Sequence, residues 1–182
     1  RDAQESRGLG DVYKRQVDTN SYNSYNVSRA KQLLAEAGYP NGFDMTIKVP
    51  SNYTFHMETA QVVAEQLKAA GINAKIEGIE WSSWLSDVYA NRDYQATICA
   101  LTADLTPSSL LVRFTSGYSK NFVNFSDAEY DKVYAEAQAS LDDNVRKEKY
   151  AKLQQILAEK EGSVFIQAAA CLLYTSPSPR DS

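Results

Sequence analysis

Three segments of the chain show the hydrophobic patterns of β-strands. Residues 43–50 and 72–79 alternate apolar and polar side chains, as strands with one buried face do, and residues 94–101 form an apolar run typical of a strand covered on both faces. Between the first two, residues 57–70 carry apolar positions at helical spacing. This order predicts a parallel strand–helix–strand unit with a right-handed crossover, extended by a third strand.

Helical periodicity also precedes this unit. Ser28 can cap a helix over residues 29–37, and Gly38 and Gly71 are placed to end the two helices in the left-handed conformation. One face of the first helix is expected to be a buried stripe made of Ala30, Leu33, Leu34 and Ala37.

The second half of the chain has mainly helical patterns. Ser126 and Glu129 have the spacing of a capping box and predict a helix to about residue 140, and Asp142 with Asp143 begins another that reaches about residue 160. The inward faces are expected to carry Tyr130, Val133, Tyr134 and Ala137 on the first helix and Val145, Tyr150, Leu153, Ile156 and Leu157 on the second. Short helices over residues 80–91 and 108–114 and a final strand over residues 163–170 complete an α/β fold, with a β-α-β-α-β core and additional C-terminal helices.

The most informative polar residues follow the third predicted strand. Thr102 and Asp104 come directly after its apolar run, and Pro107, which cannot donate to a sheet ladder, marks the loop beyond it. In open α/β sheets ligands bind beyond the carboxyl ends of the strands, so Asp104 stands where a ligand site is expected. The structural alternative is a carboxylate that only accepts local backbone hydrogen bonds.

The two ends of the chain look foreign to the rest. Residues 6–16 (SRGLGDVYKRQ) and 171–181 (CLLYTSPSPRD) back-translate into DNA segments that are almost reverse complements of each other. These segments resemble the transposase adapter used for sequencing libraries. We therefore expect residues 1–16 and 171–182 to be non-native, and residues 17–170 to be a fragment of a longer gene.

Composition narrows the range of partners. The net charge is −4 for the 182 residues and becomes −5 without the two ends, because five of the 19 basic and four of the 23 acidic residues lie in them. A mildly acidic chain speaks against nucleic acid or an anionic membrane as its partner. Cys99, the only cysteine outside the ends, lies in an apolar run and is interpreted as a packing residue.

Catalytic and metal chemistry find little support in the sequence. His56 is the only histidine and has no Cys, Asp or Glu at ligand spacing, so we expect it to face solvent or pack in a loop, with no metal and no cofactor. No nucleophile elbow, phosphate-binding loop or dinucleotide fingerprint occurs, and we expect no enzymatic activity. Trp81 and Trp84, three apart on a predicted helix, favour core packing over ligand stacking.

Several short motifs occur in a recognisable order. The first is AKQLLAEAGYPNGF at residues 30–43, and LKAAGI follows at residues 67–72 before a strand. Next come Glu80-Trp81, the loop with Asp104 and Pro107, Asn124-Phe125, Tyr130-Asp131, Ala137 and a helix over residues 146–157. Together they resemble the C-terminal third of the family 5 extracytoplasmic solute-binding proteins, the dipeptide- and oligopeptide-binding components of ABC importers.

This resemblance implies a periplasmic-binding-protein-like C-terminal lobe of a two-lobed protein that closes around its ligand. In peptide-binding members, an aspartate after the third strand pairs with the α-ammonium of the ligand, and Asp104 is the matching position. The other implied ligand-binding residues are Leu101 and Thr102 in the same loop, and Asn52 and Tyr53 in the loop after the first strand.

Departures from the family pattern widen the expected ligand class. Leu101 stands where peptide binders usually have tryptophan, and Thr106 replaces the acid of an acidic-proline pair. The loop over residues 51–56 also lacks the arginine that often binds the ligand carboxylate. We therefore expect a peptide or another small solute, including a cationic one.

The resemblance further implies that ABC transporter permease subunits are partners, that the protein is a monomer, and that it is periplasmic or lipid-anchored on the outer face of the cytoplasmic membrane. Two alternatives stay open. One is a solute-sensing regulatory module with the same fold, and the other is a binder of a non-peptide ligand such as a nickel chelate or an oligosaccharide. The fragment alone is expected to bind little, because it would contribute one lobe of two.

Overall fold

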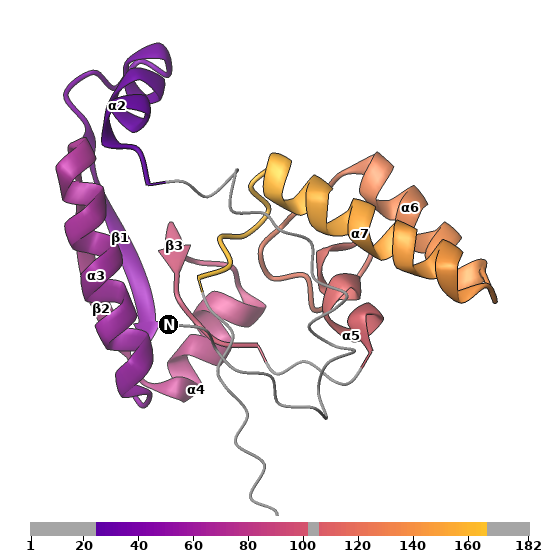
Figure 1. The fold of residues 1–182 in the computed structure, drawn as a ribbon. Coiled ribbons are helices and arrows are strands. Elements are labelled where there is room, and N and C mark those ends of the chain that lie inside the picture. Colours follow the sequence, from indigo (N-terminus) through magenta and orange to yellow (C-terminus); the bar gives the residue numbers. More distant parts are fainter. Residues whose placement is uncertain (1–24, 102–105, 167–182) are drawn as a thin grey trace, which may run out of the picture.

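The computed structural model describes residues 25–101 and 106–166, which form a mixed α/β structure (Figure 1). Its sheet has three parallel strands, with β1 (Phe43–Pro50) between β2 (Ile72–Ile79) and β3 (Ala96–Thr97). The α/β class predicted from the sequence is confirmed.

The strands β1 and β2 have the bounds that the alternating pattern predicts, and they pair in register along all 8 residues. They are connected by α3 (Thr54–Ala70), which packs on the sheet. Ala60 of α3 is fully buried against Ile47 and Val49 of β1, so the predicted apolar faces of strand and helix meet in one core.

Two glycines hold the amino ends of these strands together. Gly71 ends α3 with φ 103°, the left-handed conformation predicted for it. Gly42, before β1, has φ 75°, and a Cβ at this position would lie 1.8 Å from the carbonyl oxygen of Gly71. The close approach of the two chain segments therefore requires a residue without a side chain at position 42.

The third strand is much shorter than predicted. The apolar pattern indicated a strand over residues 94–101, but β3 consists of Ala96 and Thr97 alone, paired with Ile47 and Lys48. A longer β3 would run beside the end of β1, where Pro50 has no N–H to donate. The chain leaves the sheet there, and the N–H of Ala100 bonds to a side chain instead.

The helix α2 (Val27–Glu36) differs from the prediction in its cap and in its burial. Asn26 caps it, because its Oδ1 accepts the N–H of Arg29 at 2.9 Å, whereas Ser28 lies inside the helix. No α2 residue is buried. The predicted stripe is only partly covered, because Ala30 and Leu34 are half-buried whereas Leu33 is 46% exposed. Gly38 has φ 90° and ends the helix as predicted.

The short helices lie close to their predicted places. After β2, α4 (Trp81–Ser83) continues into a π-helix (Trp84–Ala90). After the gap in the described chain, α5 (Pro107–Leu111) continues into a 3-10 helix (Val112–Phe114).

Two long helices, α6 (Ala128–Ala139) and α7 (Asp143–Glu159), pack side by side at the other end of the molecule from α3 (Figure 1). The predicted capping box is wrong in detail: the carboxylate of Asp127 accepts the N–H of Tyr130 at 2.8 Å and caps α6. The hydroxyl of Ser126 instead contacts Ser116. Aspartate is as good a cap as serine, so the sequence pattern alone did not separate the two.

The core between these helices matches the predicted inward faces with two exceptions. Tyr134 is only half-buried, and Val145 is 38% exposed at the outer end of α7. The buried members are Tyr130, Val133, Ala137, Tyr150, Leu153, Ile156 and Leu157. After α7, residues 163–166 form no strand, and the rest of the predicted final strand lies outside the described residues.

The sheet and the helical pair are connected through a third core. Trp84 and Val88 of the π-helix are buried together with Phe122, which lies between α5 and α6. The guanidinium of Arg92 donates to the carbonyl of Asn121 at 3.1 Å, and the hydroxyl of Tyr94 donates to the carbonyl of Phe122 at 2.8 Å. The two parts are thus held by buried apolar contacts and by backbone acceptors.

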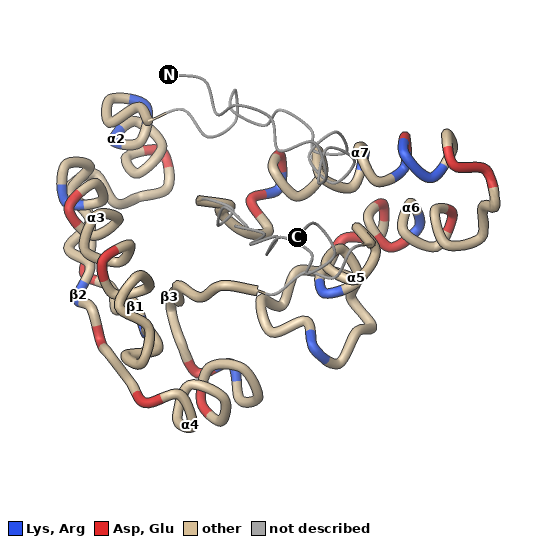
Figure 2. Tube along the Cα trace, turned by 60° about the horizontal axis from the view of Figure 1, so that its bottom comes forward, with Lys and Arg blue, Asp and Glu red and all other residues tan. Residues whose placement is uncertain are grey.

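The charged side chains of the two long helices pair across their interface. The helix α6 is mainly acidic, whereas α7 carries a group of basic side chains (Figure 2). Lys149 pairs with Glu136, and Lys152 pairs with Glu129. Within residues 25–101 and 106–166, no helix is both long and apolar enough to cross a membrane.

Candidate ligand-binding site

Of the five predicted site residues, three lie in the described chain before its gap and two lie within the gap. Asp104 and Thr102 lie outside the described residues, so their predicted ligand contacts stay predictions. Leu101 is half-buried and packs against the core formed by Trp84 and Phe122. The described chain from β3 to Leu101 carries no charged residue (Figure 2).

The loops that follow β1 and β2 lie next to each other, because the two strands are parallel and end in register. The N–H of Ser51 donates to the carbonyl of Ile79 at 2.8 Å. The side chain of Asn52 reaches the start of α4: its Oδ1 accepts the N–H of Trp81 at 2.9 Å, and its Nδ2 donates to Glu80 at 3.3 Å. The amide of Asn52, predicted to contact a ligand, is used to connect these two loops.

Three aromatic rings meet at this carboxyl edge of the sheet, and we call Tyr53, Trp81 and Trp84 the aromatic shelf. Trp81 stacks on Trp84 with ring centroids 5.1 Å apart and an interplanar angle of 6°. Tyr53 meets Trp81 edge-on, with centroids 5.6 Å apart and an angle of 86°. Trp84 is 2% exposed, whereas Trp81 is 36% and Tyr53 is 40% exposed.

The two tryptophans, for which core packing and ligand stacking were the two interpretations, therefore differ in their surroundings. Trp84 packs in the core, as predicted, and Trp81 lies over it with part of its surface in solvent. Exposed aromatic faces attract apolar groups and cations, and the carboxylate of Glu80 stands beside Trp81 in the sequence. The described edge can thus hold an apolar or positively charged group of a ligand.

The buried tryptophan is anchored to the sheet through a hydroxyl. The indole Nε1–H of Trp84 donates to Oγ1 of Thr97 at 2.9 Å, and the same hydroxyl donates to the carbonyl of Lys48 at 2.7 Å. Lys48 in turn donates to the backbone carbonyl and the carboxylate of Asp93, at 2.7 and 3.1 Å. These bonds join β1, β3 and the π-helix under the shelf.

His56 is not a loop or solvent residue, which corrects the expectation from the sequence. The helix α3 begins at Thr54, earlier than predicted, and His56 in its first turn is 5% exposed. Its Nε2 accepts the N–H of Ala100 at 2.9 Å, and its ring lies against those of Tyr53 and Phe55. Burial lowers the pKa of His56 and so favours the neutral imidazole, the form that can accept this hydrogen bond.

Cys99 agrees with its interpretation as a packing residue. It packs beside the Trp84 core, and burial raises the pKa of its thiol to about 11. A thiol with such a pKa is not a nucleophile at neutral pH. Within the described residues, no group of three or more His, Cys, Asp or Glu side chains could hold a metal ion.

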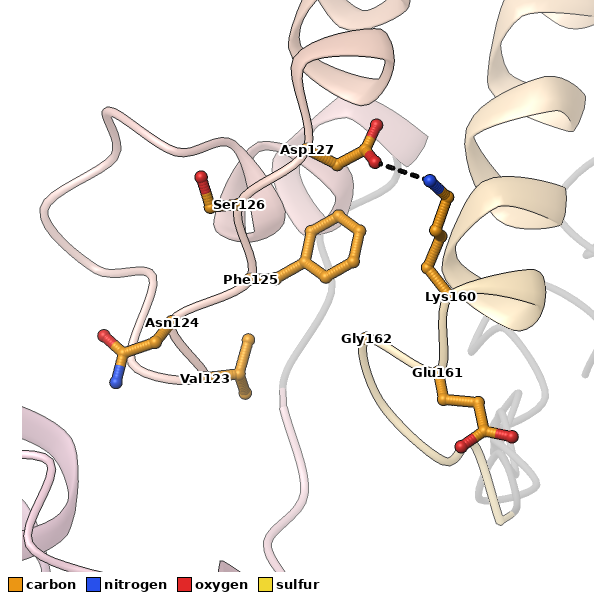
Figure 3. A pocket seen from close by; sticks show the side chains of 8 residues that line it. All are labelled: Val123, Asn124, Phe125, Ser126, Asp127, Lys160, Glu161 and Gly162. Atoms are coloured by element: carbon orange, nitrogen blue, oxygen red, sulfur yellow. Dashed lines mark ion pairs between the residues drawn. The ribbon is translucent and has the colours of Figure 1, made fainter. Parts of the chain in front are cut away.

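A separate hollow of about 480 Å³ opens near the ends of α6 and α7 (Figure 3). Two of its three charged side chains serve the fold, because Asp127 caps α6 and pairs with Lys160 at 3.1 Å. Its lining residues are Val123, Asn124, Phe125, Ser126, Asp127, Lys160, Glu161 and Gly162.

Comparison with known proteins decides the family. Residues 7–122, more than half of the chain, match the model of the bacterial extracellular solute-binding proteins, family 5 middle region. The chain belongs to this family. The resemblance inferred from the sequence motifs is thereby confirmed.

Individual relatives agree with this assignment. The oligopeptide-binding protein AppA of Bacillus subtilis is 29% identical over 169 residues, which are 85% of this chain and 31% of AppA. The crystal structure of Haemophilus influenzae OppA in complex with the peptide RPPGFSPFR is 30% identical with a TM-score of 0.69, and the match covers 75% of this chain and 27% of OppA. The chain therefore spans about a third or less of the length of these relatives.

A third relative carries a different ligand. The structure of the binding protein AgaA from A. tumefaciens R10, in complex with agropinic acid, is 27% identical with a TM-score of 0.65, covering 75% of this chain and 29% of AgaA. One fold thus serves ligands other than ordinary peptides among the proteins that this chain is similar to.

Sequence reasoning missed two members of the described edge. Trp81 was assigned to the core, because its spacing with Trp84 does not reveal which ring lies outside. Thr97 was hidden inside an apolar run, where a single hydroxyl gives no signal. A hydroxyl within a buried strand does need a hydrogen-bond partner, and that need is the signal that was available.

Proposed function

We propose that this chain is part of an extracytoplasmic binding protein that captures peptides for an ABC importer. The observation that carries the proposal is the family match together with exposed aromatic rings at the carboxyl edge of the sheet, where α/β proteins bind ligands. Its relatives include proteins named for oligopeptide binding. The ligand is bound and released without chemical change.

The proposed mechanism is closure of two lobes around the peptide. This chain supplies most of one lobe, and contacts to both lobes stabilise the closed state only when ligand is present. Asp104 pairs with the α-ammonium of the peptide, and Leu101, Thr102 and Tyr53 line the same site. Asn52 contributes indirectly, since its amide bonds to Trp81 and Glu80. Delivery to membrane permease subunits follows, from a periplasmic or lipid-anchored monomer.

The domain proposal is that residues 17–170 are native and that residues 1–16 and 171–182 derive from sequencing adapters, although the family match begins at residue 7. The length of the relatives agrees with a longer parent protein. Sequencing the source gene with adapter-trimmed reads tests this: the reading frame should continue past residue 170 with sequence other than CLLYTSPSPRDS.

A non-peptide ligand is the second candidate, favoured by the relative that holds agropinic acid and by the missing tryptophan and acid around Asp104. To separate the two, the complete parent protein is incubated with pools of di- to pentapeptides, sugars, opines and nickel chelates. Gel filtration then removes unbound molecules, and mass spectrometry identifies what remains. We expect peptides, and retention of only sugars, opines or nickel chelates would reject the peptide proposal.

A further inference from the structure

We infer that Asn52 and Thr97 are positioning residues that set the geometry of the aromatic shelf. Both side chains bond to the protein: the amide of Asn52 to Trp81, and the hydroxyl of Thr97 to Trp84 and Lys48. The link to ligand binding rests on the proposed function, but the geometry itself can be tested without a ligand.

Asn52 holds Trp81, the partly exposed tryptophan of the aromatic shelf, through its backbone N–H. Trp81 is the first residue of α4, so its N–H has no earlier helical carbonyl to bond. Asn52 Oδ1 supplies that acceptor at 2.9 Å, from the loop that also carries Tyr53. The backbone of Trp81 is thereby held at the place where Tyr53 meets its ring edge-on.

Thr97 holds Trp84, the buried tryptophan of the aromatic shelf, through its indole N–H. Its hydroxyl accepts from the indole of Trp84 and donates to the carbonyl of Lys48, so both its donor and its acceptor are used. Trp84 is 2% exposed, and an indole N–H buried without a partner would be costly. The hydroxyl therefore selects the ring orientation on which Trp81 stacks with an interplanar angle of 6°.

The chain offers a clean optical signal for this geometry. Trp81 and Trp84 are its two tryptophans, so a stacked indole pair is the only source of indole–indole exciton coupling in circular dichroism. Trp81→Phe removes the pair and identifies the couplet in the 182-residue chain.

The decisive comparison uses variants with matched controls. Thr97→Val keeps the shape and loses both hydrogen bonds, Thr97→Ser keeps the hydroxyl, and Thr59→Val removes a hydroxyl that bonds only to its own helix, at Phe55. Asn52→Ala is matched by Asn73→Ala, whose amide bonds to Asp44 at 3.0 Å near the opposite, amino end of the sheet.

We expect Thr97→Val and Asn52→Ala each to lower the couplet amplitude at least about twofold, while Thr97→Ser, Thr59→Val and Asn73→Ala retain it. An unchanged couplet in a folded Thr97→Val or Asn52→Ala variant overturns the role of that residue. If Thr97→Val does not fold, the couplet of Thr97→Ser decides: a loss equal to that of Trp81→Phe would contradict the hydroxyl argument.

The consequence for binding is measured separately on the complete parent protein. With RPPGFSPFR as the probe, Asn52→Ala should bind about threefold to tenfold more weakly than the parent, the range that one net hydrogen bond supports. Asn73→Ala should match the parent. Loss of the couplet without loss of affinity would support the shelf geometry but show that the shelf does not take part in peptide binding. No binding by the complete parent protein itself would count against this peptide as the ligand.

Discussion

The buried histidine provides a quantitative test of the structure, through the dependence of stability on pH. His56 accepts the N–H of Ala100 as a neutral imidazole, and its burial lowers its pKa in the folded state below the ordinary value of 6.5. The unfolded chain protonates near 6.5, so below that pH it binds more protons than the folded chain does. Folding stability is therefore expected to fall as the pH drops from 6.5.

The magnitude follows from linkage. One group that is protonated only in the unfolded state changes the free energy of unfolding by at most about 1.4 kcal/mol per pH unit. Between pH 7.5 and 5.5 the loss for His56 is therefore at most about 1 kcal/mol, since the effect begins only near 6.5. His56 is the only histidine, and carboxylates contribute mainly below this window, so the signal belongs to one side chain.

The assay is urea unfolding of the 182-residue chain at pH 7.5, 6.5 and 5.5, followed by tryptophan fluorescence. His56→Gln is the control, because glutamine cannot take up a proton in this range. The free energy of unfolding of the unsubstituted chain should decrease from pH 7.5 to pH 5.5, and that of His56→Gln should stay constant. An equal decrease of the unfolding free energy in both chains, or no decrease in the unsubstituted chain, would refute a buried neutral imidazole at this position.

Two further predictions test the frame that supports the site. Gly42→Ala should destabilise the chain by about 2–5 kcal/mol, because a left-handed alanine costs about 1–2 kcal/mol and displacing backbone adds about 1–3 kcal/mol. Gly38→Ala, with φ 90° but open space around its Cβ, should cost only about 1–2 kcal/mol, and equal shifts in urea midpoint would contradict the close approach to Gly71. Leu153→Ala, at a fully buried position between α6 and α7, should cost about 2–5 kcal/mol. Leu141→Ala, at 97% exposure, should stay within about 0.5 kcal/mol of the parent, and similar losses in both would argue against the assigned core.

The features that the sequence predicted well are those in which local pattern and tertiary structure agree. The alternation in β1 and β2 coincides with one buried face, and Gly38 and Gly71 end helices because the left-handed conformation favours glycine. These signals depend on neighbouring residues only, and so they could be found without the fold.

The features that failed depend on distant contacts. The apolar run before Leu101 predicted a long strand, but its pairing ends where β1 reaches Pro50, which lies far away in the sequence. His56 was placed in a loop because its acceptor role requires Ala100 to come near.

The candidate site was predicted by topology more than by residue role. The carboxyl edge of the sheet follows from parallel strands, and Tyr53 does lie there with an exposed ring. The roles of Asn52 and Trp81 depend on a hydrogen bond between two loops, which no single-segment pattern contains.

The central claim is that the parent protein binds peptides through this edge. The most direct measurement is the thermal midpoint of the complete parent protein against di- to pentapeptides, because a ligand of the native state raises the midpoint by mass action. The account predicts stabilisation by peptides that is strongly reduced in Asp104→Ala and Trp81→Ala but not in Asn73→Ala. No stabilisation by any peptide, together with a response to sugars or nickel chelates, would contradict it.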